Sequence, residues 1–136
     1  ERAEDLDLSI ISLDMDGLKR INDTYGHAEG DEALHSLGNI IRSNLKQEFA
    51  ARIGGDEFLV AFAGKDIGGR TREIVDRIEQ GIYEYNKVSN KAYELQASIG
   101  SYTDCVQGHS LDYFLKKADD LMYACKYNHK KAQGLI

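Results

Sequence analysis

Two pairs of acidic residues in this sequence have the side chains that hard cations prefer. Asp14 and Asp16 come directly after an apolar run, and Asp56 and Glu57 lie between two apolar stretches further along the chain. Mg²⁺ takes oxygen ligands and is usually held by one or two carboxylates together with substrate phosphates. If the two stretches are neighbouring antiparallel strands, Asp14 and Asp56, which are 42 positions apart, converge on one site. The pattern therefore predicts a metal site that joins two distant parts of the chain.

The first acidic pair also has structural alternatives. Asp14 can simply end a strand, and Asp16 can cap a short helix over residues 17–25. We favour metal binding for Asp14 and the capping role for Asp16. The turn Gly17-Leu18-Lys19 begins that helix, and its free backbone N–H groups could bind phosphate, although every helix start offers such groups.

The segment around the second acidic pair predicts a β-hairpin. Residues 50–63 are two short apolar runs joined by Gly54-Gly55-Asp56-Glu57. Adjacent glycines suit a sharp turn because they allow positive φ, and they also let another molecule approach the backbone closely. An ordinary solvated turn is the alternative.

A third group of polar residues could recognise a nucleobase. Asn22 and Asp31 belong to a stretch that is rich in Asn, Asp and Gly. Side chains of these two types can bind the edge of guanine, because the carboxylate accepts from the ring N–H and the exocyclic amine. Helix ends and loops of the same composition are the alternative.

The elements that must position these groups follow from apolar periodicity. It predicts strands at residues 8–14, in the hairpin and at 93–103, and helices at 17–25, 28–46, 71–87 and 110–127, the last capped by Ser110. The main order, β-α-β-β-α-β-α, predicts an α+β fold of the ferredoxin-like or cyclase type, with helices packed around an antiparallel sheet. We expect the helices on one face of that sheet, and helices that are apolar on a single side favour this arrangement over a doubly wound fold.

The composition is that of an ordinary globular domain. The 136 residues are 42% apolar and 29% charged. The net charge of −6 argues against binding to a nucleic-acid backbone, and any phosphate ligand would need local cations or a metal. Cys105 and Cys125 are expected as reduced thiols in a cytoplasm. No apolar run is long enough to cross a membrane, and the first residue, Glu1, suggests a piece of a larger protein.

Four segments resemble motifs of the GGDEF family, the bacterial diguanylate cyclases that make cyclic di-GMP from GTP. Arg52–Phe58 resembles the family's signature, and Asp14–Asp31 resembles its opening motif, D-x-D-x-(F/L)-K-x-I-N-D-x-x-G-H-x-x-G-D, position by position. Ser98–Gly100 resembles its S-I-G strand, and Ala118–Lys126 resembles its A-D-x-A-L-Y-x-A-K helix. The motifs occur in the family's order and cover nearly the whole chain.

The resemblance implies a role for each matching residue. The metal ions would be held by Asp14, the Met15 carbonyl and Asp56. Glu57 would assist at the metal or at the attacking hydroxyl, so that the catalytic residues are Asp56, Glu57 and Asp14. Guanine would be bound by Asn22 and Asp31. The rest of the substrate would be bound by Gly17, Leu18, Lys19, Gly54, Gly55, Lys126 and Lys130.

The resemblance also implies the reaction and its partners. Two Mg²⁺ (or Mn²⁺) ions about 3.5–4 Å apart would activate a ribose 3′-OH and neutralise charge at the α-phosphorus and on the leaving pyrophosphate. Each domain would bind one GTP, so the active form would be a symmetric homodimer. Attached sensor or effector domains and a cytoplasmic location, free or tethered to a membrane anchor, are expected, with no nucleic-acid partner and no direct membrane contact. A regulatory GTP-binding module without cyclase activity is the alternative.

The chain departs from the family near the hairpin and at its two ends. The R-x-x-D site of product-inhibited members has Leu45 and Glu48 here, so inhibition through it is not expected without the guanidinium. The family's upstream helical segment, with D-x-L-T-x-L-x-N-R, matches nothing here, so residues 1–136 are expected to be a GGDEF domain without that segment.

The last motif also carries substitutions. Leu121 and Cys125 replace smaller residues, and His129-Lys130 stands where the family usually has Gly-Arg. Lys130 keeps the positive charge without the planar fork of arginine, which predicts weaker phosphate binding.

Overall fold

A four-stranded antiparallel sheet carries the two acidic pairs. The computed structural model describes residues 6–136, which form β1 (Asp7–Met15), α1 (Leu18–Tyr25), α2 (His27–Ser43), β2 (Phe49–Arg52), β3 (Glu57–Gly64), α3 (Gly68–Val88), β4 (Ala97–Cys105) and α4 (Leu111–Ala132). The sheet order is β2-β3-β1-β4. The predicted α+β fold, with its antiparallel sheet and hairpin, is confirmed. In the described part of the chain, no helix is long and apolar enough to cross a membrane.

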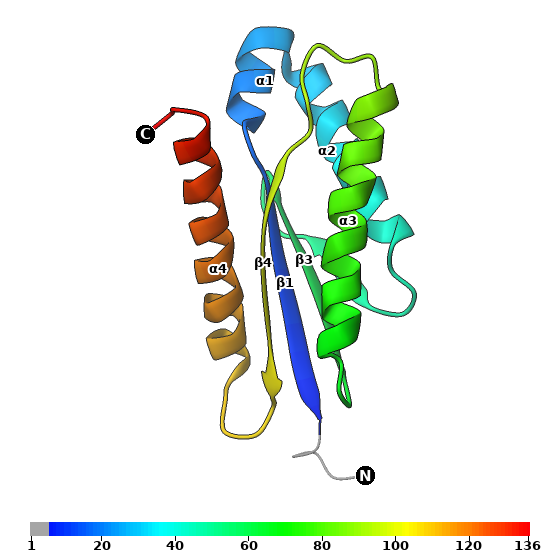
Figure 1. The fold of residues 1–136 in the computed structure, drawn as a ribbon, viewed down its shortest axis with the longest axis vertical. Helices are drawn as coiled ribbons and strands as arrows, with labels where there is room; N and C mark the ends of the chain where they lie inside the picture. Colours follow the sequence, from blue (N-terminus) through cyan, green and yellow to red (C-terminus); the bar gives the residue numbers. More distant parts are fainter. Residues whose placement is uncertain (1–5) are drawn as a thin grey trace.

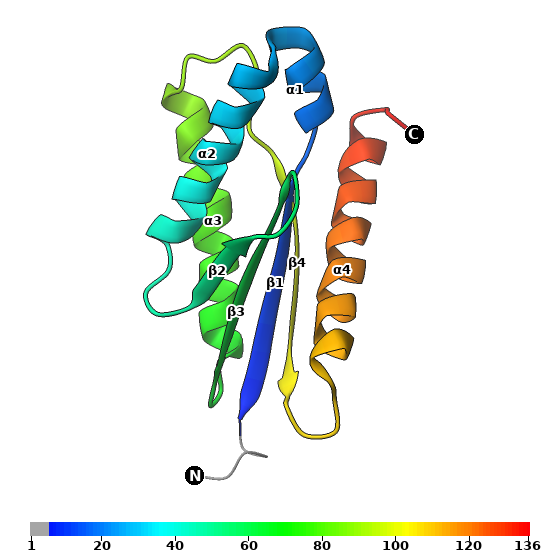
Figure 2. The ribbon, with the colours of Figure 1, turned by 180° about the vertical axis from the view of Figure 1, so that it is seen from behind.

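Helices cover both faces of the sheet, so the expectation of a single covered face is wrong. α4 lies along one face, and α2 and α3 lie on the other (Figures 1 and 2). The reason is that the central strand β1 is buried on both sides. Ile11 and Leu13 belong to the larger core with α2 and α3, whereas Ile10 packs against Phe114 and Ala118 of α4. A strand buried on both faces needs a helical layer on each.

The largest differences from the predicted element boundaries are at the start of β4 and at the end of α4, and smaller shifts occur at the end of α2 and the start of α3. β4 begins at Ala97 rather than at residue 93, because its partner β1 ends at Met15, directly opposite Ala97. α4 continues to Ala132 rather than ending near residue 127, and the first glycine after its start is Gly134. The extra turn of α4 matters for the site, because it carries His129 and Lys130.

The start of α4 matches the prediction in its cap. The Ser110 side chain accepts a hydrogen bond from the Tyr113 backbone N–H at 3.2 Å. Phe114, Ala118 and Met122 of α4 are buried, whereas Leu111 is exposed. It lies at the first position of α4.

α4 packs directly on the backbone of β4 at Gly100. A Cβ added to Gly100 would lie 2.2 Å from the Met122 nitrogen and 2.4 Å from the Ala118 carbonyl oxygen, so no side chain fits between strand and helix. This contact sets the height of α4 above the sheet. It thereby sets the position of Lys126, which lies one turn beyond Met122 on the same helix.

A partly buried ion pair ties the loop before β2 to the start of α3. Arg70 donates from Nε to Glu48 Oε2 at 2.8 Å and from Nη2 to Glu48 Oε1 at 3.1 Å. Hydrogen bonding from Arg70 is the largest cause of a lowered pKa at Glu48, about 2. Glu48 occupies the position of the acid in the family's R-x-x-D site, and here its carboxylate is engaged within the domain.

We expect Glu48→Gln to destabilise the domain in a pH-dependent manner. The folded-state pKa of Glu48, about 2, lies below its ordinary value of 4.5, so the pair stabilises fully above about pH 4.5 and its contribution is lost as the pH falls toward 2. Urea denaturation should show a loss of about 1–2 kcal/mol at pH 7. The difference between wild type and variant should shrink below pH 4.5, and a constant difference down to pH 2.5 would contradict this assignment.

Candidate active site

The end of β1 and the turn between β2 and β3 bring the two predicted metal-binding acids together. Asp14 lies opposite Glu57 in the sheet register, and the Met15 N–H donates to the Asp56 carbonyl oxygen at 3.0 Å. The side chains of Asp14 and Asp56 are close enough that Asp56 raises the pKa of Asp14. Two carboxylates from distant parts of the chain therefore lie next to each other in one site.

Asp14 is a buried carboxylate that uses only one of its two oxygens in a hydrogen bond. Its Oδ2 accepts from Lys126 Nζ at 2.7 Å, whereas Oδ1 is the one buried side-chain polar atom without a hydrogen-bond partner among residues 6–136. Burial raises the pKa of Asp14 to about 6, Lys126 opposes the rise, and Asp56 adds to it. A buried acceptor without a donor is costly unless a ligand satisfies it. Oδ1 of Asp14 is therefore suited to a cation.

The donor set fits a hard cation that brings further ligands with it. Within the described residues, no three His, Cys, Asp or Glu side chains form a metal-binding cluster. Two carboxylates are nonetheless the usual protein share for Mg²⁺, which keeps several waters and binds substrate phosphates. The residues present fit a divalent ion that binds together with a nucleotide.

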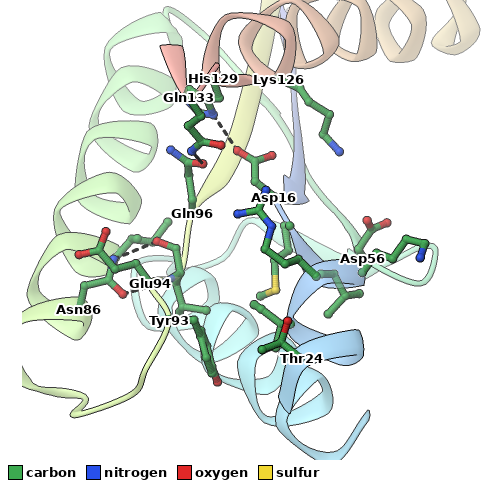
Figure 3. A pocket seen from close by; sticks show the side chains of 18 of the residues that line it. Asp16, Thr24, Asp56, Asn86, Tyr93, Glu94, Gln96, Lys126, His129 and Gln133 are labelled. Carbon is green, nitrogen blue, oxygen red and sulfur yellow. Dashed lines mark hydrogen bonds and ion pairs between the residues drawn. The ribbon is translucent and has the colours of Figure 1, made fainter. Parts of the chain in front are cut away.

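A cavity of about 1110 Å³ opens beside these acids (Figure 3). It is bounded by α1, by the segment that leads into β4 and by the ends of α3 and α4. Of the residues predicted to bind metal or substrate, those that line it are Met15, Gly17, Leu18, Lys19, Asp56, Lys126 and Lys130. The predicted phosphate-binding groups and Asp56 therefore face one space.

The acidic residues keep the lysine at this cavity protonated. Burial opposes protonation of Lys126, but Asp14, with Asp16 and Asp56, raises the pKa of this lysine. Lys126 thus keeps its charge, and its ammonium group lies next to the Asp14 carboxylate.

Asn22 of α1 and Asp31 of α2 are not among the residues that line this cavity. A Cβ added to Gly30 would lie 1.8 Å from Asn22 Oδ1, so the Asn22 side chain rests directly on the Gly30 backbone. Asp31 follows on α2 and is exposed. The two predicted guanine-binding residues are therefore neighbours.

The hairpin turn does not use the conformational freedom of its glycines, and that expectation is wrong. Neither Gly54 nor Gly55 has a positive φ. The turn is held instead by the Arg52 guanidinium, which donates to the Gly55 carbonyl at 2.6 Å. A Cβ at Gly54 would lie 3.4 Å from Glu57 Oε1, and a Cβ at Gly55 would meet nothing within 4 Å. The glycines leave an open surface, which agrees with a ligand close to the backbone.

Asp16 does not cap α1, so the prediction that favoured this role is wrong. Gly17, with φ 72°, occupies the cap position, and no side chain caps the helix. Asp16 Oδ1 accepts from Ser98 Oγ at 2.7 Å, and Asp16 Oδ2 lies 2.7 Å from His129 Nδ1 (Figure 3). Both oxygens are taken by residues that lie 82 and 113 positions away in the sequence, for which local pattern gives no signal.

Two further residues lie near the site although the sequence analysis gave them no role in it. His129 was visible as a substitution in the last motif, and the structure gives it a partner in Asp16. Tyr123 stands at the tyrosine of the family's helix motif, and the charge of Glu57 is the first cause that raises its pKa. The Tyr123 ring therefore lies near the acid that follows Asp56.

Nearly the whole chain matches a known family model. The model described as "Diguanylate cyclase, GGDEF domain" matches residues 1–132. Diguanylate cyclase A of Treponema denticola is 33% identical over 123 residues, which are 89% of this chain and 33% of that protein. MucR of Pseudomonas aeruginosa, named a bifunctional diguanylate cyclase/cyclic di-GMP phosphodiesterase, is 32% identical over 96% of this chain and 18% of its own length. The chain thus spans a third or less of these relatives.

Solved structures agree with the sequence match. The active GGEEF domain of a diguanylate cyclase from Vibrio cholerae superposes with a TM-score of 0.76 at 28% identity, over 90% of this chain and 78% of that one. The GGDEF domain of DgcB from Caulobacter crescentus, solved with c-di-GMP, gives a TM-score of 0.75 at 26% identity, over 90% of this chain and 74% of that one. With the motifs, the fold and the family model in agreement, this chain belongs to the GGDEF domain family.

Proposed function

We propose that this domain, residues 1–136, is a diguanylate cyclase, which converts two molecules of GTP into cyclic di-GMP and pyrophosphate. The observation that carries the proposal is the buried Asp14 carboxylate, whose Oδ1 lacks a partner in the described structure while Asp56 lies beside it. Membership of the GGDEF family and relatives named diguanylate cyclases support it.

Asp14, Asp56 and the Met15 carbonyl would hold two divalent ions, Mg²⁺ or Mn²⁺. When bound, such ions make a ribose 3′-OH a better nucleophile and neutralise charge on the α-phosphate and the pyrophosphate. Glu57 would assist at the metal or at the attacking hydroxyl. This role agrees with its position opposite Asp14 in the sheet.

The remaining residues would bind and orient the nucleotide. The backbone N–H groups of Gly17 and Leu18 and the lysines Lys19, Lys126 and Lys130 would hold the phosphates along the cavity wall that they line. Asn22 and Asp31 would bind guanine, and the open face at Gly54 and Gly55 would let the nucleotide lie against the hairpin. Positioning of this kind accounts for a large share of catalysis in group transfer.

Gly30→Ala tests the guanine site without touching a proposed ligand. The new Cβ would lie 1.8 Å from Asn22 Oδ1, which is too close. The Asn22 side chain must therefore rotate away, which a side chain can do more easily than backbone. We expect KM for GTP to rise about tenfold or more with a smaller change in kcat, and the helix to be retained. Gly69→Ala is the matched control, since a Cβ there meets nothing within 4 Å. An unchanged KM would remove Asn22 from base recognition.

The reaction joins two nucleotides, so the active form would be a symmetric homodimer with one GTP on each subunit. Sensor or effector domains attached to this one, and a cytoplasmic location, belong to the same proposal. The relatives support attached domains, because this chain covers only 33% and 18% of their lengths.

The direct test is product formation. Protein held as a dimer by a fused leucine zipper is incubated with GTP and Mg²⁺, and cyclic di-GMP, pyrophosphate and bound GTP are quantified. Both products should form. GTP binding without product would select the second candidate, a regulatory GTP-binding module, which the His129-Lys130 substitution at the cavity wall favours. A protein that neither binds GTP nor forms product would overturn both candidate functions.

A further inference from the structure

A thiol, an imidazole and a carboxylate lie in a row beside the cavity. Cys125 Sγ is 3.6 Å from His129 Nε2, and the opposite ring nitrogen, Nδ1, is 2.7 Å from Asp16 Oδ2. Ser98 Oγ donates to the other Asp16 oxygen at 2.7 Å and so fixes that carboxylate. In this order a histidine can accept a proton from a nucleophile on one side while an acid orients its ring from the other.

Two members of the row depart from the resembled motifs. Cys125 and His129 stand where the resembled motifs have alanine and glycine. They are four residues apart on α4, which brings them onto one side of the helix. The cyclase reaction proposed above gives neither of them a role, so their contact calls for another explanation.

We propose that Cys125 is a modification site, a nucleophilic thiol that His129 activates and that reacts with hydroperoxides. Cys125 is half-buried rather than sealed in the core, so a small oxidant can reach the sulfur. Asp16 is a positioning residue, because it holds the imidazole and does not touch the thiol.

The chemistry balances with a peroxide as the only co-reactant. His129 Nε2 takes the thiol proton as the sulfur attacks one peroxide oxygen; an S–O bond forms and the O–O bond breaks. The leaving hydroxide, or the alkoxide of an organic hydroperoxide, takes the proton from His129 and departs as water or alcohol. Sulfur is oxidised by two electrons to sulfenic acid, and the peroxide is reduced. Reaction with an alkylating agent follows the same first step, with halide as the leaving group.

Rates of modification at each cysteine test the proposal without any assay of cyclase activity. The reduced protein is treated with iodoacetamide, or with hydrogen peroxide and a sulfenic-acid trap, and the rates at Cys125 and Cys105 are measured by mass spectrometry. His129→Gln should lower the rate at Cys125, relative to Cys105 in the same molecule, by about tenfold. His35→Gln is the matched control on an exposed helix position and should change nothing. Equal ratios in wild type and His129→Gln would overturn the proposal.

A second variant separates lost activation from a loosened helix. His129→Gly removes the ring and leaves room for a small base. Imidazole added to the solution should restore the rate at Cys125 at least severalfold, because it can take the proton in place of the missing side chain. A slow rate that imidazole does not raise, or a Cys125 rate that rises together with the Cys105 rate, would overturn the general-base role of His129.

Discussion

Asp56→Asn should leave the fold intact and reduce cyclic di-GMP formation by about a thousandfold or more. Asparagine keeps the size of the side chain and loses the charge that a second carboxylate brings to the cation beside Asp14. The backbone contact from the Met15 N–H to the residue 56 carbonyl is unaffected. Product would be measured by chromatography, and the fold by circular dichroism and thermal unfolding.

The stability of Asp56→Asn gives an independent check on the geometry. Asp56 adds to the raised pKa of Asp14, which means that the two carboxyl groups disfavour each other's charge. Removing one of them should therefore not destabilise the domain. Asp76→Asn, an exposed acid on α3, makes the same change of charge away from the site and should keep full activity. Retained turnover in Asp56→Asn would remove Asp56 from the metal role.

Gly100→Ala should destabilise the domain by at least about 3 kcal/mol. A Cβ at this position would lie 2.2 Å from the Met122 nitrogen and 2.4 Å from the Ala118 carbonyl oxygen. These are backbone atoms of α4, so no side-chain rotation can make room. The helix must lift from the sheet, and Lys126 must move away from Asp14.

Urea denaturation of Gly100→Ala against Gly68→Ala measures this effect. A Cβ at Gly68 meets nothing within 4 Å, and its φ is not positive, so the control should change stability by less than about 1 kcal/mol. If Gly100→Ala does fold, its cyclase activity should fall with the displaced Lys126. A variant as stable as the control would show that α4 does not rest on β4 at this point.

Much of this fold could be predicted because its signals are local. The glycines and acids of residues 54–57 between two apolar runs gave the hairpin, and the expectation that β1 pairs with β3 put Asp14 beside Asp56. The expectation that helices cover only one face of the sheet was wrong, and the reason is visible in β1. Ile10 and Ile11 are adjacent and both buried, and a strand with apolar residues in succession is covered on both sides.

The parts of the site that could not be predicted depend on contacts between distant residues. Asp16 has the residue type and position of a helix cap, and the cap was the reasonable expectation from the sequence. Its carboxylate instead meets Ser98 and His129, and this depends on how far α4 extends and how closely it sits on β4. Neither quantity is encoded in the apolar periodicity of a single helix.

The division of the interior into two cores has a consequence for motion. α4 is held by the smaller of them, whose buried residues are Ile10, Phe114 and Ala118, and by the buried Met122, whereas α2 and α3 share the larger. A helix with the smaller apolar anchor detaches at a lower free-energy cost than the rest of the domain. α4 should therefore exchange its amide hydrogens through subglobal opening, taking Lys126 and His129 with it while the sheet and the opposite layer stay closed.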